Sequence, residues 1–126
     1  FALIDKRRYA PNKSKVSHLI GELDNMDVLI IDDMIDTAGT TVSAAEAAIN
    51  KGAKSVTAIA THGVLSGPAI NRLKNASIKN IVITDTILVS EEKKIENMKI
   101  VTVADVFGAA INRIYNGESV SSLFEF

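Results

Sequence analysis

The chain has 126 residues, of which 47% are apolar, so it is long enough for one domain with one hydrophobic core. Its net charge of -1 comes from 14 basic and 15 acidic residues, and this balance argues against a nucleic-acid partner. Cysteine is absent, which excludes disulfides and agrees with a cytoplasmic location, and no apolar run is long enough to predict a membrane partner.

The N-terminal part of the chain predicts the end of a strand, a basic loop and a helix. Residues 2–5, ALID, fit the end of a strand, and residues 6–13, KRRYAPNK, form a basic segment with a proline. Residues 14–23 have apolar side chains at helical spacing after a serine that can cap, so we predict a helix there, with His18 in a structural position. A turn is expected at residues 24–27.

From residue 28 onward, apolar strand patterns alternate with helical ones. This alternation predicts an α/β domain with a mostly parallel sheet flanked by helices. Strands are predicted at residues 28–31, 56–60, 81–83 and 100–103. Helices are predicted at residues 41–51 (closed by Gly52), from Pro68 onward and at 105–115, with a helical turn at 95–98. We expect the last helix to turn Phe107, Ala110, Ile111 and Ile114 toward the core.

The segment 28–41, VLIIDDMIDTAGTT, carries most of the functional information. Four apolar residues suit a strand that is buried on both faces of a parallel sheet, and Asp32, Asp33 and Asp36 follow directly. Acids at the carboxyl end of such a strand lie where open α/β sheets bind ligands. The small, hydroxylated loop before the next helix suits a phosphate, because backbone amides and the helix dipole favour an anion.

Each of these residues also fits a plain scaffold, since Asp and Thr cap helices well. Three acids within five residues, however, repel one another unless something positive lies among them, so their combination favours a ligand site. The segment lacks the G-x-x-x-x-G-K-[ST] pattern of the common nucleotide loop.

The basic cluster after the first strand predicts a clamp for a polyphosphate. Lys6, Arg7 and Arg8 are expected at the same edge of the sheet as the Asp32 segment, because parallel strands end on one side. A solvated surface is the plainer reading of such a cluster. His62, at the end of a predicted strand, is read as structural.

The chain resembles the ribose-phosphate diphosphokinases, also called phosphoribosyl pyrophosphate synthetases, in their C-terminal part. The similarity runs through IDKRR, VLIIDDMIDTAGTT, ATHGVLSGPAINRL, NIVITDT and NGESVSSLF, and so covers nearly the whole chain. VLIIDDMIDTAGTT alone would indicate only the wider type I phosphoribosyltransferase fold. The resemblance implies transfer of the diphosphate of ATP to the C1 hydroxyl of ribose 5-phosphate, with Mg2+ and release of AMP.

The resemblance also implies roles for individual residues. Lys6 and Arg8 would be catalytic, stabilising charge on the transferred group. The loop Asp36, Thr37, Ala38, Gly39 and Thr40 would bind the 5-phosphate, and Asp32 and Asp33 would bind sugar hydroxyls, with at most an indirect role for these two in holding a metal. Ser119, Ser121 and Phe124 would help bind an allosteric phosphate or ADP, and the complete enzyme would be a hexamer built from dimers.

The same comparison implies that residues 1–126 form a partial C-terminal phosphoribosyltransferase-like domain, with an N-terminal domain and one central strand upstream of Phe1. We therefore expect a sheet that is incomplete at its N-terminal side and a fragment that is inactive alone. Two alternatives remain at this point. One is a phosphoribosyltransferase that uses the activated sugar, and the other is a non-catalytic subunit that regulates a synthetase.

Overall fold

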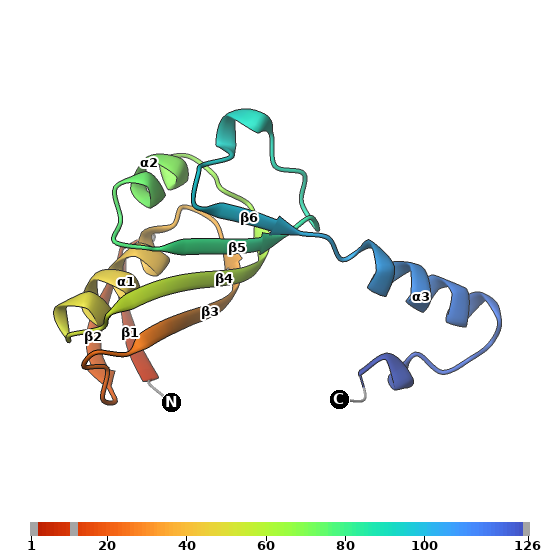
Figure 1. The fold of residues 1–126 in the computed structure, drawn as a ribbon, viewed down its shortest axis with the longest axis horizontal. Helices are drawn as coiled ribbons and strands as arrows, with labels where there is room; N and C mark the ends of the chain where they lie inside the picture. Colours follow the sequence, from red (N-terminus) through yellow and green to blue (C-terminus); the bar gives the residue numbers. More distant parts are fainter. Residues whose placement is uncertain (1–2, 11–12, 125–126) are drawn as a thin grey trace.

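The computed structural model describes the backbone of residues 3–10 and 13–124, and the side chains of residues 21–124. Strands and helices alternate through most of this part of the chain (Figure 1). The elements are β1 (Leu3–Ala10), β2 (Lys13–Ile20), β3 (Asp27–Ile35), α1 (Gly39–Asn50), β4 (Ser55–Gly63), α2 (Ala69–Lys74), β5 (Asn80–Thr84), η1 (Glu91–Lys93), β6 (Met98–Val101), α3 (Ala104–Tyr115) and η2 (Ser121–Phe124).

Four strands form a parallel sheet in the order β3-β4-β5-β6, which confirms the predicted α/β fold. All four predicted strands of this sheet are present, and β3 and β4 extend several residues beyond the apolar runs that predicted them. β3 lies at one edge of the sheet, so the expected open edge falls beside the strand that carries Asp32 and Asp33.

The core lies on the face of the sheet that α1 and α2 cover. The small side chains of α1, Ala45 and Ala48, are buried against Val56 and Ala58 of β4, which lets helix and sheet approach closely. Leu73 of α2 joins the same cluster. As predicted, α1 closes at Gly52, which adopts φ +89 and donates its N–H to Ile49 O at 2.9 Å.

The opposite face of the sheet is open, and the prediction that residues 28–31 are buried on both faces is wrong. Val28 and Ile30 are half-buried under the helices, whereas Leu29 is 62% and Ile31 75% exposed. Successive side chains of a strand point to opposite faces, and no described segment covers the second face. The apolar run therefore suits a strand that is covered on both faces, and the described part of the chain covers only one of them.

The N-terminal segment differs from its prediction. β1 and β2 form a separate antiparallel hairpin, so the basic segment 6–13 contributes to both strands, and residues 14–23 do not form a helix. Residues 11–12 lie outside the described part of the chain. In residues 14–23, the pairing of β2 with β1 overrides the helical spacing of the apolar residues. Strand formation depends more on neighbouring strands than on local preference. β2 lies next to α1 (Figure 1).

Two C-terminal expectations are confirmed in part. The helical turn predicted at 95–98 is a single hydrogen-bonded turn, in which the Met98 N–H donates to Ile95 O at 2.9 Å, whereas the 3-10 helix lies earlier, in η1, and Met98 already belongs to β6. α3 forms where it was predicted, but it extends away from the sheet (Figure 1), and Phe107 and Ile111 are 58% and 66% exposed. Ile114 is exposed and Ala110 half-buried, so the apolar side of α3 is not turned into the described core.

Within residues 3–10 and 13–124, no helix combines the length and the apolar character that crossing a bilayer requires.

Candidate functional site

The β3–α1 loop, residues 36–38, leads directly into the N-terminus of α1. Ala38, the residue before the helix, is 3% exposed and adopts a left-handed conformation with φ 60, and its carbonyl accepts the Val42 N–H at 3.0 Å. An L-residue in this conformation is held there by its surroundings. The loop therefore has a shape fixed by the fold, immediately before the positive end of the α1 dipole.

The start of α1 is suited to an anion. The first backbone amides of a helix have no partner within the helix. Because the residue before the helix is an alanine, it offers them no side-chain oxygen, and the first turn of α1 holds no acidic residue. The start of α1 therefore has the features of an anion site that the sequence analysis predicted for a phosphate.

Asp32 and Asp33 lie near the carboxyl end of β3, beside this loop. Asp32 is half-buried and Asp33 exposed. The Asp33 N–H donates to Asp32 Oδ1 at 3.1 Å, and the Met34 N–H donates to Asp33 Oδ1 at 2.8 Å. These local bonds orient both side chains, and carboxylate oxygens are acceptors for the hydroxyls of a sugar.

Asp36 has a different environment, because its carboxylate accepts a hydrogen bond from the Ser66 hydroxyl. The main chain strengthens this connection, since the Ser66 N–H donates to Asp36 O at 3.0 Å. Sequence analysis assigned Asp36 to the 5-phosphate loop, and that role stays a prediction. The structure places its side chain in the contact between the β3–α1 loop and the loop after β4.

Arg72 is a site residue that the sequence analysis missed. It lies on α2, and its Nη1 donates to Thr37 O at 2.9 Å, across 35 residues of sequence. No local sequence pattern predicts this contact, because it depends on how α2 packs beside the loop. Arg72 is thereby a positive charge at a loop that the sequence showed to be rich in acids.

His62 belongs to a small polar network at the carboxyl ends of β4 and β5. Its Nδ1 lies 2.8 Å from Thr86 Oγ1, while the hydroxyls of Thr84 and Thr86 donate to Thr61 O at 2.7 and 3.1 Å. With its single hydrogen used on Thr61 O, the Thr86 hydroxyl accepts a hydrogen bond from Nδ1–H of His62. This arrangement agrees with a structural role for His62.

Asp85 continues the same edge of the sheet. Hydrogen bonds from the Thr102 hydroxyl and the Val103 N–H, the latter 2.9 Å long, hold the pKa of the Asp85 carboxyl below its usual value of 3.8. The ionised carboxylate thus joins the end of β5 to the residues just before α3.

The predicted basic residues lie on β1, and the argument that placed them at the ligand edge is wrong. β1 pairs with β2 in its own antiparallel sheet and not with the parallel strands, so the rule that parallel strands end on one side does not apply to it. The side chains of Lys6 and Arg8 lie outside the described part of the chain, and their catalytic role stays a prediction.

The C-terminal residues predicted for allosteric binding lie in or beside η2. Ser119 Oγ accepts the Ser121 N–H at 3.2 Å, and Phe124 is 65% exposed. Arg113 of α3 donates to Ser119 O at 3.1 Å, which ties the tail to the helix. No described residue outside this C-terminal segment takes part in these bonds.

The described side chains do not form a metal site. Within residues 21–124, no group of three or more carboxylates or histidines is arranged to hold an ion. Mg2+ commonly binds through one or two carboxylates together with substrate phosphates. The described residues therefore do not form a complete protein cage for the ion.

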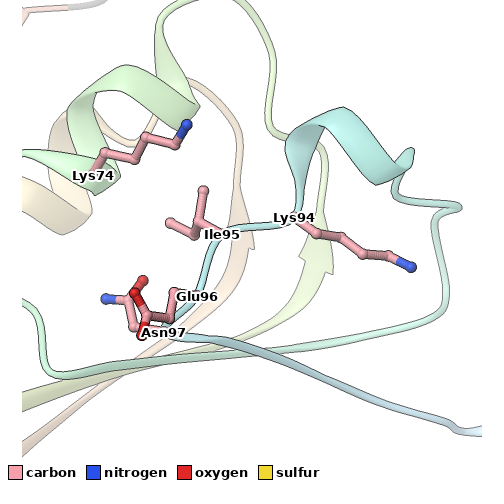
Figure 2. Close-up of a pocket in the computed structure, with 5 residues that line it drawn as sticks. All are labelled: Lys74, Lys94, Ile95, Glu96 and Asn97. Carbon is pink, nitrogen blue, oxygen red and sulfur yellow. The ribbon is translucent and has the colours of Figure 1, made fainter.

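A shallow hollow of about 720 Å³ lies at the other end of the sheet, between the end of α2 and the segment before β6 (Figure 2). Its lining residues are Lys74, Lys94, Ile95, Glu96 and Asn97, and the Lys94 ammonium forms an ion pair with Glu91. Ligands of open α/β sheets bind at the carboxyl ends of the strands, so this hollow is separate from the candidate site.

Comparison with known proteins identifies the family. The family described as phosphoribosyl synthetase-associated domain matches residues 7–125. The chain belongs to this family. It is also 54% identical over 123 residues to a ribose-phosphate pyrophosphokinase of Caldanaerobacter subterraneus and 50% identical over 124 residues to one of Clostridium acetobutylicum. Each alignment covers 98% of this chain and 39% of the relative.

A solved structure supports the same assignment. The chain is similar to phosphoribosylpyrophosphate synthetase from Mycobacterium smegmatis, with a TM-score of 0.77, 30% sequence identity and coverage of 83% of this chain and 34% of that one. The synthetase resemblance and the α/β fold inferred from the sequence are thus confirmed. The chain spans less than half the length of these relatives.

Proposed function

We propose that this chain is the part of a ribose-phosphate pyrophosphokinase that binds ribose 5-phosphate. The observation that carries the proposal is the β3–α1 loop, in which left-handed Ala38 leads into a helix N-terminus beside Asp32 and Asp33. Family membership supports the choice of a phosphorylated pentose over other anions.

In this proposal, the 5-phosphate lies on the amides at the start of α1, within the loop Asp36, Thr37, Ala38, Gly39 and Thr40. Asp32 and Asp33 accept hydrogen bonds from hydroxyls of the ribose. Both contacts use groups that the fold has already oriented, so little order is lost when the sugar binds.

The whole protein's reaction would transfer a diphosphate. The C1 oxygen of ribose 5-phosphate forms a bond to the β-phosphorus of ATP, the bond from that phosphorus to the oxygen bridging to the α-phosphate breaks, AMP leaves, and the C1 hydroxyl proton is released. Lys6 and Arg8 would stabilise charge on the group in transfer. Positioning and electrostatics would supply most of the rate, because no described side chain is an obvious strong base for the C1 hydroxyl.

The remaining assignments concern the complete protein. Mg2+ would neutralise charge on the phosphates of ATP and would be held mainly by them, with Asp32 and Asp33 contributing at most indirectly. We further propose a cytoplasmic homo-oligomer, a hexamer built from dimers, regulated by phosphate or ADP at a site that includes Ser119, Ser121 and Phe124.

Isothermal titration calorimetry of the 126-residue chain tests the core of the proposal. We expect ribose 5-phosphate to bind more tightly than either inorganic phosphate or ribose, because both halves of the site contribute. The complete protein should release AMP from ATP only in the presence of ribose 5-phosphate. Equal affinity for ribose 5-phosphate and inorganic phosphate would contradict a site that also recognises the sugar.

A further inference from the structure

The β3–α1 loop is joined to the β4–α2 loop by continued main-chain pairing. Beyond the ends of the strands, the Leu65 N–H donates to Ile35 O and the Ser66 N–H to Asp36 O, each at 3.0 Å. The Ser66 hydroxyl also donates to the Asp36 carboxylate. The two loops therefore form one connected unit, of which only the first has an assigned role.

Each loop contains a buried residue with positive φ that is not glycine. Ala38 has φ 60 and Leu65 φ 51, and the two are 3% and 1% exposed. Such conformations persist only where neighbouring contacts determine them, and they gather at functional sites. The paired loops hold their shape against the local preference of their own residues.

Arg72 holds the other end of this unit. Its Nη1, 2.9 Å from Thr37 O, also lies 3.2 Å from the point where a Cβ on Gly39 would be, so the guanidinium packs against the end of the loop and the first residue of α1. The peptide bond from Thr37 to Ala38 is trans, since the described backbone contains no cis bond. In a trans peptide the C=O and N–H point in opposite directions, so a carbonyl fixed on Arg72 directs the Ala38 N–H away from α2.

We propose that Arg72 is a positioning residue for the anion loop, which it holds in its binding shape through Thr37 O. The inference rests on the proposed function, because it assigns the loop's anion as the 5-phosphate. Arg72 also brings a permanent positive charge to a segment with three carboxylates. It acts through the main chain of Thr37 and Ala38 and does not itself touch the reacting atoms.

Variants of the 126-residue chain separate this role from a general charge effect. Arg72→Gln removes the charged donor, Arg72→Lys keeps one, and Lys74→Gln removes the same charge from the same helix, at a residue that lines the hollow at the far end of the sheet. Calorimetry with ribose 5-phosphate measures affinity, and amide NMR of Ala38 and Gly39 without ligand reports the shape of the loop. Thermal unfolding shows whether each variant is folded.

We expect Arg72→Gln to weaken ribose 5-phosphate binding by about tenfold or more, the effect of losing a hydrogen bond from a charged donor. It should also move the Ala38 and Gly39 amide signals. Lys74→Gln should change neither, and Arg72→Lys should recover most of the affinity. Amide signals in Arg72→Gln that match those of the parent chain would overturn the proposal, as would an unchanged affinity.

The two proposals can fail separately. If the parent chain does not bind ribose 5-phosphate, the proposed function fails, whereas the amide signals of ligand-free Arg72→Gln still decide whether Arg72 shapes the loop. If the parent chain binds the sugar and Arg72→Gln binds it equally well, only the positioning role is lost.

Discussion

Asp33 is exposed at the end of β3, and its side chain accepts the Met34 N–H through one oxygen. Asp33→Asn keeps an acceptor for that bond but removes the charge offered to a sugar hydroxyl. We expect affinity for ribose 5-phosphate to fall about tenfold, as for loss of a charge-assisted bond, while inorganic phosphate binds as before or slightly better. Calorimetry with both ligands measures this, and equal losses for both would contradict a contact to the sugar.

Gly52 offers a residue-scale test of stability. It has φ +89, and a Cβ there would lie 2.5 Å from Asp24 Oδ1 and 3.3 Å from Asp24 Cα. Gly52→Ala should lower the free energy of unfolding by about 1–2 kcal/mol, from the left-handed conformation and the contact together. Urea denaturation measures the change. Gly108→Ala is the matched control, because a Cβ there meets nothing within 4 Å, and it should not lower stability.

Among single residues, the loop could be proposed from sequence as a candidate site, whereas the residues that contact it could not be predicted. Small, hydroxylated residues after an apolar strand indicate a phosphate loop because local geometry alone makes the site. Arg72 and Ser66 reach the loop only through the packing of α2 and the loop before it, over 30 residues or more. No local pattern records such a contact.

At the scale of elements, Asp85 links β5 to α3 through Val103 and Thr102. Because these bonds lower the pKa of Asp85 in the folded chain, their stabilising contribution is present above the usual value of 3.8 and is lost as the pH falls through the lowered pKa. NMR titration of the Asp85 carboxyl should give a midpoint below 3.8. A midpoint at or above that value would contradict the link.

Asp85→Asn provides the second half of this test. The variant removes the titrating group, so hydrogen exchange of the Val103 amide should lose the acid-dependent increase that the parent chain shows. The Asp27 carboxylate is a useful reference, because its pKa is also lowered, chiefly by the Ser55 hydroxyl, at the opposite end of the sheet.

The elements of the parallel sheet were predictable because their patterns are local. β4 and β5 alternate buried and half-buried residues, and α1 ends at a glycine that must adopt positive φ. β2 was not predictable, since the helical spacing of apolar residues in 14–23 carries no information about a strand that forms by pairing with β1. The apolar side of α3 predicted burial, but helical periodicity does not show which surface packs against that side.

At the scale of the whole molecule, the chain covers 39% of the length of each of two relatives that are named ribose-phosphate pyrophosphokinase. We expect the isolated 126-residue chain to bind ribose 5-phosphate without producing AMP from ATP. A coupled assay for AMP checks this, with a full-length relative as the positive control. Turnover close to that of the full-length relative would show that the described fold is sufficient for catalysis.

The position of α3, away from the sheet, has a consequence for calorimetry of the chain alone. The heat capacity rises on unfolding in proportion to the apolar surface that becomes exposed to water. Phe107, Ile111 and Ile114 are already exposed in the folded chain, so they add little to this rise. The heat-capacity change of unfolding per residue should therefore be smaller than that of a compact domain of equal length. The helix itself should melt gradually, at temperatures where β4 and β5 still hold their shape.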